Sequence, residues 1–235
     1  MKRSPELHCL NCKQRQESIF CKTHEESLDQ IDEHKTCTIY KKGQAIFQQS
    51  QHAFGVYCVN AGKIKLTQSG EDGKEQIVRL AKDGDVLGYR ALLSGDNFSA
   101  SAIVIEEASV CFIPKETFLG VMDNENSVSM EIIKRLSEDL KRAQERITQL
   151  AQKSVRERTA ETLLFLKEVF GYEADNLTID ITLSREDLAS LIGTATETAI
   201  RLLSEFKHDG LIELNGKRIK LIKMKELVKV ANVLD

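Results

Sequence analysis

The sequence predicts an α+β protein built from a β-roll of the jelly-roll type, a long helix and a C-terminal winged helix-turn-helix. Three observations carry this prediction. Short alternating runs separated by glycines fill the first half, an apolar repeat of helical period follows, and two short helices precede a hairpin near the C-terminus. The predicted boundaries are 1–24 for a cysteine-rich segment, 25–118 for the roll, 119–153 for the long helix and 154–235 for the winged helix-turn-helix.

The composition is that of an ordinary globular protein with room for two small domains. Of its 235 residues, 41% are hydrophobic and 29% are charged. No apolar run reaches the roughly 18 residues of a membrane helix, and no apolar stretch follows Lys2 and Arg3 to make a signal peptide. We therefore expect a cytoplasmic protein without membrane contact. The net charge of −3 leaves any binding of nucleic acid to the local arrangement of charges.

The roll is predicted from short strands with glycine turns. Lys63–Leu66 and Gln76–Leu80 alternate between apolar and polar residues, and Gly70–Gly73 between them has the composition of a hairpin tip. Pro114 closes the last strand of this region. Regular spacing of such strands favours a small barrel or jelly roll.

A narrow apolar seam runs along the predicted long helix. Its members alternate in spacing between three and four residues, and they are Ile133, Leu136, Leu140, Ala143, Ile147 and Leu150. Charged residues flank the seam on both sides. This pattern favours a dimerisation helix, and hence a homodimer, over the alternative of an amphipathic helix that lies on its own domain.

The strongest signal is a pair of short helices. Ser184 and Asp187 form a capping box that opens the first, and Gly193 ends it. Thr194 is predicted to cap the second helix, with Glu197 at the matching position. The buried face of the second helix is expected to hold Ala195, Ala199, Leu202, Leu203 and Phe206.

The opposite face of the second helix carries side chains suited to reading bases in double-stranded DNA. Arg201 can donate two hydrogen bonds to guanine, Glu197 can accept one from cytosine, and Ile200 can pack on a thymine methyl group. Thr196 joins them near the start of the helix, where such helices touch base edges. The alternative is a solvated Glu–Arg pair that stabilises the helix by about 0.2–0.5 kcal/mol.

A β-hairpin with an Asn215–Gly216 turn follows and is predicted to be the wing. Before the first short helix, Leu177–Leu183 alternates like a further strand. Positive and hydroxyl side chains on the wing and the second helix suit contacts with DNA phosphates. The expected phosphate contacts are Thr194, Ser204, Lys217, Arg218 and Lys220.

Specific stretches resemble the Crp/Fnr family of bacterial transcription regulators from about residue 25 to the end. They are Gly62–Lys65, Gly84–Gly88, Leu183–Ala189 and Thr196–Leu203. The resemblance implies a cyclic-nucleotide-binding-like roll, a homodimer on an inverted-repeat DNA site, RNA polymerase as a partner, and no enzymatic activity. Glu197 and Arg201 match the family's base-reading pair, whereas Ile200 stands where the oxygen-sensing branch has a serine.

The cyclic-nucleotide branch of the family uses a glutamate for the ribose and an Arg–Ser pair for the phosphate. Here Gly88–Arg90 lacks the acid, and Phe98–Ser99 replaces the Arg–Ser pair. Burying a cyclic phosphate without its arginine would leave its charge uncompensated. We expect no binding of cyclic AMP.

The chain contains six cysteines, and three of them, Cys9, Cys12 and Cys21, lie close together in the sequence. Thiolates bind soft metals and iron–sulfur clusters, and a [4Fe–4S] cluster takes four ligands. The remaining cysteines are candidates for the fourth, although Cys37 and Cys58 lie in probable core strands. The resemblance to the oxygen-sensing branch selects Cys111, just before Ile113–Pro114. It implies a [4Fe–4S] cluster on Cys9, Cys12, Cys21 and Cys111 that senses oxygen or nitric oxide.

Other interpretations of the cysteines stay open. They are structural zinc, a thiol–disulfide switch and an inert tail; we expect no structural disulfides in a reducing cytoplasm. The regulator can instead respond to a small effector in the roll, or the chain can be a regulatory subunit of an enzyme. An enzyme in its own right lacks support, because no nucleophile–base pair or phosphate-binding glycine loop is visible.

Overall fold

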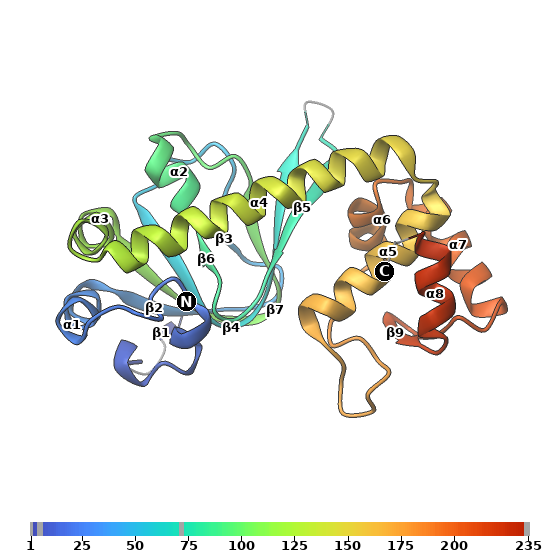
Figure 1. Cartoon of the computed structure of the whole chain (residues 1–235), viewed down its shortest axis with the longest axis horizontal. Helices are drawn as coiled ribbons and strands as arrows, with labels where there is room; N and C mark the ends of the chain where they lie inside the picture. Colours follow the sequence, from blue (N-terminus) through green and yellow to red (C-terminus); the bar gives the residue numbers. More distant parts are fainter. Residues whose placement is uncertain (1, 4–6, 71–72, 233–235) are drawn as a thin grey trace. The chain divides into compact units, whose positions relative to one another are not determined.

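The computed structural model describes residues 2–3, 7–70 and 73–232, so Glu71 and Asp72 of the predicted hairpin tip lie outside the described residues. The chain divides into two compact units, Met1–Leu140 and Lys141–Asp235, and each is considered by itself (Figure 1). None of the described helices combines the length and the hydropathy that crossing a membrane requires.

An antiparallel sheet forms the body of the first unit. Within the described residues its strands follow the order β1-β2-β7-β4-β5, with β3 on β7 and β6 on β4. The bounds are β1 Lys2–Arg3, β2 Thr36–Tyr40, β3 Ala45–Phe47, β4 Gly55–Ser69, β5 Glu75–Ala81, β6 Val86–Leu87 and β7 Ser101–Pro114. The curled sheet confirms the predicted roll of the jelly-roll type.

The long strands β4 and β7 pair closely, and two glycines of β4 allow it. A Cβ atom on Gly55 would lie 2.1 Å from the Ile113 carbonyl oxygen. Gly62 has a φ of +109°, and a Cβ there would lie 2.5 Å from Ala108 Cα. The core between the strands is apolar, with Val56, Val59, Ile64, Val104 and Val110 all buried.

The α-helices of the first unit bury apolar side chains in this core, whereas the two short 3-10 helices within its described residues contain no buried residue. The helices are η1 Cys9–Asn11, η2 Lys13–Glu17, α1 Glu25–His34, α2 Tyr89–Ser94, α3 Lys115–Asn124 and the start of α4 Asn126–Gln152. Helices α1 and α3 lie side by side in Figure 1 and contact each other. Leu28, Ile31, Phe118, Val128 and Ile132 bury their side chains in the core.

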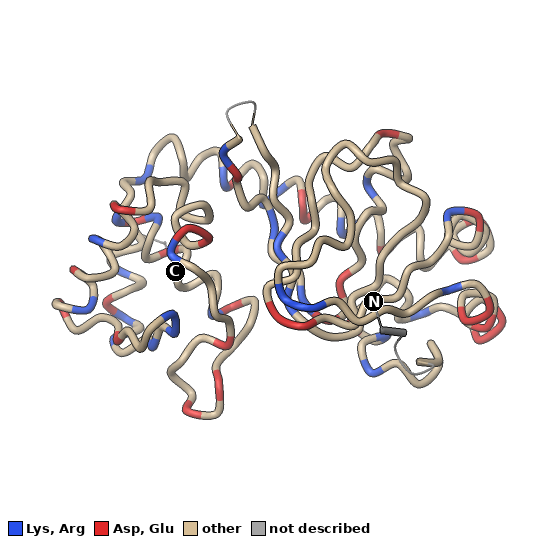
Figure 2. Tube along the Cα trace, turned by 180° about the vertical axis from the view of Figure 1, so that it is seen from behind, with Lys and Arg blue, Asp and Glu red and all other residues tan. Residues whose placement is uncertain are grey.

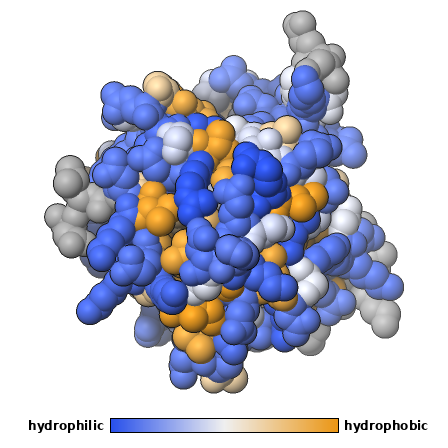
Figure 3. Space-filling view, turned by 90° about the vertical axis from the view of Figure 1, so that its right-hand side faces the viewer, coloured by the Kyte–Doolittle hydropathy of each residue, from blue (hydrophilic) through white to orange (hydrophobic). Residues whose placement is uncertain are grey.

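The second unit is a winged helix-turn-helix, as predicted. Its elements are α5 Val155–Phe170, α6 Arg185–Ile192, α7 Thr196–His208, β8 Ile212–Asn215, β9 Arg218–Leu221 and α8 Met224–Ala231. Ser184 caps α6 with the predicted capping box, and β8 pairs antiparallel with β9 through the Asn215–Gly216 turn. A space-filling view of one face of the molecule shows hydrophobic groups separated by hydrophilic side chains (Figure 3).

Three predictions about the second unit are wrong. Leu177–Leu183 forms no strand. It meets β9 only through isolated contacts, such as the hydrogen bond from Ile179 N–H to Ile219 O, and therefore makes isolated bridges. Ala195, and not Thr194, is the N-cap of α7. The turn after Gly193 takes up Thr194, whose N–H donates to Ala189 O, so Ala195 is exposed and does not join the buried face.

Candidate functional site

A buried arginine on α5 fixes the turn between α6 and α7. Arg158 Nε donates to Ile192 O at 3.0 Å, and its Nη2 donates to Gly193 O at 3.1 Å. Its Nη1 donates to Lys153 O at 2.8 Å. These carbonyls lie at the C-terminal end of helices, where backbone oxygens lack helical partners. Arg158 therefore sets the angle at which α7 leaves the turn, and sequence patterns gave no signal for it.

Helix α7 buries one face and exposes the other. Ala199, Leu202, Leu203 and Phe206 are buried, which confirms the predicted apolar face apart from Ala195. The opposite face carries the predicted base-reading side chains. Thr196 is half-buried, whereas Glu197, Ile200 and Arg201 are exposed. This face is therefore free of the unit's own core and open to a ligand.

Arg201 belongs to a chain of ion pairs along this face. It pairs with Glu205, one turn later in α7. Glu205 Oε2 lies 3.1 Å from Arg156 Nη1, and Arg156 Nη2 lies 2.8 Å from Asp209 Oδ2. Because the Arg201 side chain is 64% exposed, its pair with Glu205 is weak in water and can be exchanged for a stronger acceptor.

The wing carries positively charged side chains beside α7, but acidic side chains lie close to two of them. Lys217 and Arg218 are exposed. Arg218 lies 3.3 Å from Glu173, and Lys220 lies 3.5 Å from Asp175. Basic and acidic residues interleave along the chain (Figure 2). Phosphate binding here would exchange exposed ion pairs rather than fill a purely basic surface.

The other two expected phosphate contacts lie at the turn and on α7. Thr194 is half-buried in the turn. Ser204 is exposed, and its hydroxyl donates to Ile200 O at 3.0 Å.

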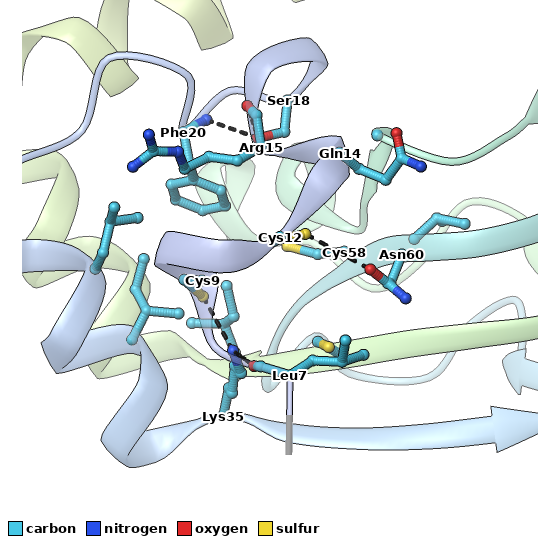
Figure 4. Close-up of a pocket in the computed structure, with 16 residues that line it drawn as sticks. Leu7, Cys9, Cys12, Gln14, Arg15, Ser18, Phe20, Lys35, Cys58 and Asn60 are labelled. Carbon is cyan, nitrogen blue, oxygen red and sulfur yellow. Dashed lines mark hydrogen bonds between the residues drawn. The ribbon is translucent and has the colours of Figure 1, made fainter. Parts of the chain in front are cut away.

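The cysteine-rich segment packs on the roll and helps to enclose a cavity of about 60 Å³. Cys9 and Cys12 of the segment, Cys58 of β4 and Cys111 of β7 all line it. Figure 4 shows Cys9, Cys12 and Cys58 around this space. The remaining wall is largely apolar and includes Phe20. Soft sulfur donors against an apolar wall fit a soft metal or an iron–sulfur cluster in kind.

Polar contacts hold Cys9 and Cys12 in place. Cys9 N–H donates to Asp32 Oδ1 at 2.9 Å, and Lys35 Nζ lies 3.1 Å from Cys9 Sγ. Cys12 Sγ donates to Asn60 Oδ1 at 3.5 Å. Burial raises the pKa of the Cys9 thiol to about 11, against the opposing effect of Lys35. Burial also raises the pKa of Cys58.

The other two predicted ligands are placed differently. Cys21 does not line the cavity. Cys111 forms a disulfide with Cys37, so the expectation of no structural disulfides is wrong for this structure. The pairing of β2 with β7 sets the two residues opposite each other with their Cα atoms 4.0 Å apart. As they stand, the described residues include no group of three His, Cys, Asp or Glu side chains arranged to hold a metal ion.

Comparison with known proteins decides the family. Residues 38–125 match the model of the cyclic nucleotide-binding domain, and residues 157–230 match that of the Crp-like helix-turn-helix domain. The chain is 30% identical over 219 residues to the fumarate and nitrate reduction regulatory protein of Salmonella typhimurium, covering 92% of this chain and 86% of that one. The chain belongs to the Crp/Fnr family. It is a DNA-binding transcription regulator, not an enzyme.

Further relatives agree with this assignment. The Vibrio cholerae protein of the same name is 29% identical over 229 residues, covering 97% of this chain and 91% of the relative. The structure of FixK2 from Bradyrhizobium japonicum superposes with a TM-score of 0.76 at 24% identity, covering 86% of this chain and 99% of that one, which shows a shared fold.

In this Crp/Fnr regulator, aromatic side chains fill part of the roll around Phe98. Phe98 is buried, and its ring stacks on Phe47 with the centroids 4.0 Å apart. Tyr89 is also buried, and its hydroxyl donates to Asp139 Oδ2 at 3.0 Å. The stack itself supplies no counter-charge to a cyclic phosphate, while exposed Arg90 lies beside it, with its Nη2 3.5 Å from Ser99 Oγ.

The predicted seam of the regulator lies on the exposed side of α4. Ile133 and Leu140 are 54% and 61% exposed, and Ile147 is 68% exposed. Leu136, Ala143 and Leu150 are exposed as well. Met130, three residues before Ile133, is also 54% exposed, although it lies outside the alternating spacing of the seam. A row of large apolar side chains in water favours a partner that covers it.

Proposed function

We propose that this Crp/Fnr regulator is a cytoplasmic sensor of oxygen or nitric oxide. Its four thiols Cys9, Cys12, Cys21 and Cys111 would hold a [4Fe–4S] cluster, whose reaction with oxygen or nitric oxide supplies the signal. Support comes from the Fnr-type relatives and from the cavity that Cys9, Cys12 and Cys111 share. Binding would require Cys111 to be released from its disulfide and to ligate as a thiolate, and Cys21 to move toward the cavity.

Direct contacts between the cysteine-rich segment and α4 carry this proposal. Arg135 of α4 donates through Nη2 to Glu17 O at 2.6 Å, and its Nη1 lies 3.4 Å from Asp85 Oδ1. Glu17 lies between Cys12 and Cys21, so any rearrangement of the segment moves an acceptor of α4. The state of the thiols is thereby coupled to the helix that carries the seam.

A second contact joins the end of the segment to the junction of α3 and α4. The buried Glu125 carboxylate accepts hydrogen bonds from His24 N–H at 3.1 Å and from Ser27 Oγ at 2.8 Å. His24 Nδ1 also lies 2.9 Å from Glu125 Oε2. Since α4 begins at the next residue, this carboxylate links the segment to the first turn of the long helix.

The proposed output is binding of a homodimer to an inverted-repeat DNA site, with RNA polymerase as a further partner. The dimer would form along 119–153, through the seam of Ile133, Leu136, Leu140, Ala143, Ile147 and Leu150. Thr196, Glu197, Ile200 and Arg201 would face the bases, because they share the exposed face of α7. Thr194, Ser204, Lys217, Arg218 and Lys220 would contact phosphates. No cyclic AMP is expected to bind.

Anaerobic purification of the whole protein tests the sensor. We expect a brown protein with about four irons per chain, which loses its visible absorption in air together with its affinity for DNA. Cys111→Ala should hold less iron and lose air-sensitive DNA binding, while its far-ultraviolet circular dichroism stays that of the wild type. Cys58→Ala is the matched control from the same cavity and should keep its iron. Wild-type iron content in Cys111→Ala would remove Cys111 from the ligand set.

A second candidate is a regulator that responds to thiol oxidation without an iron–sulfur cluster. The Cys37–Cys111 disulfide favours it. A colourless wild-type protein after anaerobic reconstitution with iron and sulfide, whose DNA affinity nevertheless changes with thiol oxidation, would select this candidate.

A further inference from the structure

Three cysteines lie in one row across three neighbouring strands of the roll. Cys111 of the central strand β7 is paired in register with Cys37 of β2 on one side and with Cys58 of β4 on the other. Directly opposite residues of antiparallel strands point to the same face of a sheet. All three sulfurs therefore project to one face, and Cys58 and Cys111 of this row line the cavity beside Cys9 and Cys12.

The two neighbours of Cys111 are not equivalent. In an antiparallel sheet, the N–H and C=O of one residue both point to the same neighbouring strand. The residue forms a hydrogen-bonded pair with that strand, in which the Cα atoms are farther apart, and a non-hydrogen-bonded, narrow pair with the strand on its other side. The Cα atoms of Cys37 and Cys111 are 4.0 Å apart, so this is the narrow pair. Its sulfurs are bonded, whereas Cys58 is a free thiol.

The bond to Cys37 has a chemical consequence for Cys111. A metal or cluster ligand must be a thiolate, and a sulfur in a disulfide carries no such charge. The same sulfur cannot serve both partners. By forming this bond, Cys37 removes a thiol that the proposed sensor needs as a ligand, although Cys111 still lines the cavity.

We propose that Cys37 and Cys111 form a reversible disulfide that excludes Cys111 from metal ligation, so that the regulator has a second redox input besides its cluster. This inference rests on the proposed function for its effect on the cluster, but not for the disulfide itself. The input is a two-electron one, and its oxidant is a low-molecular-weight disulfide. Reduction of the pair makes the Cys111 sulfur available again as a ligand.

The chemistry is two successive thiol–disulfide exchanges. The Cys37 thiolate attacks one sulfur of the small disulfide, a mixed disulfide forms, and the first small thiolate leaves. The Cys111 thiolate then attacks the Cys37 sulfur and expels the second small thiolate. Two protein thiols lose two electrons and two protons, and one small disulfide becomes two thiols. Cys37 is the entry point because it is half-buried, whereas Cys111 is only 8% exposed.

The test uses the full chain, reduced and freed of metal, and incubated without air with or without glutathione disulfide. Free thiols are then alkylated, and the disulfides are mapped by mass spectrometry of a non-reducing digest. A second portion, freed of glutathione, is given iron and sulfide, and its bound iron is measured. Cys37→Ser keeps every proposed ligand, and Cys58→Ser is the matched control from the other side of the row.

We expect a Cys37–Cys111 cross-link in the oxidised wild type and in Cys58→Ser, with at least a tenfold fall in bound iron that dithiothreitol reverses. Cys37→Ser should keep its bound iron after the same treatment. Absence of the cross-link from the wild type overturns the reversible pair. An equal loss of iron in Cys37→Ser overturns the competition, because other thiols then explain it. If the reduced wild type takes up no iron, the proposed iron–sulfur sensor is refuted. The presence or absence of the cross-link still decides whether Cys37 and Cys111 form a reversible disulfide.

Discussion

Replacing Arg158 by methionine should destabilise the second unit more than any exposed charge change on the same helix. The side chain is 8% exposed and donates three hydrogen bonds, of 2.8 to 3.1 Å, to the carbonyls of Lys153, Ile192 and Gly193. Methionine keeps much of the length but leaves all three acceptors without the cation. A buried acceptor left without its hydrogen bond costs about 1–3 kcal/mol, so the loss of all three donors should cost at least about 3 kcal/mol.

The measurement is the free energy of unfolding from denaturation in guanidinium chloride, followed by circular dichroism of the helices. Arg156→Met is the matched control on α5, because Arg156 is 39% exposed and its side chain joins two exposed ion pairs. That variant, which also loses the contact of Arg156 with the Phe206 ring, should lose about 0.5–1.5 kcal/mol. If Arg158→Met costs no more than Arg156→Met, the account of how the turn is held is refuted.

Three further predictions concern a helix cap, a buried carboxylate and Arg201, which we propose contacts a base. Ser184→Ala should destabilise the second unit by about 1 kcal/mol, since Ser184 accepts from Asp187 N–H at the start of α6; no change in the denaturation midpoint would contradict it. Desolvation opposes ionisation of Glu125, but hydrogen bonds from Ser27 and His24 outweigh it and hold the pKa of Glu125 below its usual range. Its contribution to stability is therefore complete above about pH 4.3 and is lost as the pH falls through its folded pKa, and Glu125→Gln should flatten the acid limb of stability against pH. Arg201→Ala should cost about 1–3 kcal/mol of DNA affinity at one base-pair position; a uniform loss across all sequences, measured by competition binding, would indicate a phosphate contact instead.

Several features of the second unit could be predicted because they depend only on residues that are close together in the sequence. The capping box at Ser184, the glycine at 193 and the Asn215–Gly216 turn act over a few residues, so their outcome was predictable. The same local view failed where contacts from elsewhere decide. Alternating residues around Ile179 look like a strand, but the chain there meets β9 at single residues and forms no ladder. The cap of α7 moved to Ala195 because the turn held by Arg158 takes up one residue more.

The sequence by itself determined the order of roll, long helix and winged helix-turn-helix, since hydrophobic period and turn chemistry are written in adjacent residues. Tertiary structure alone decided which cysteines meet. Cys37 and Cys111 are 74 residues apart, and their contact depends on the register of β2 on β7, which no local interaction sets. The links from the cysteine-rich segment to α4 through Arg135 and Glu125 span about a hundred residues. Such contacts exist because packing of the whole roll brings together side chains that are distant in the sequence. Patterns of neighbouring residues therefore cannot predict them.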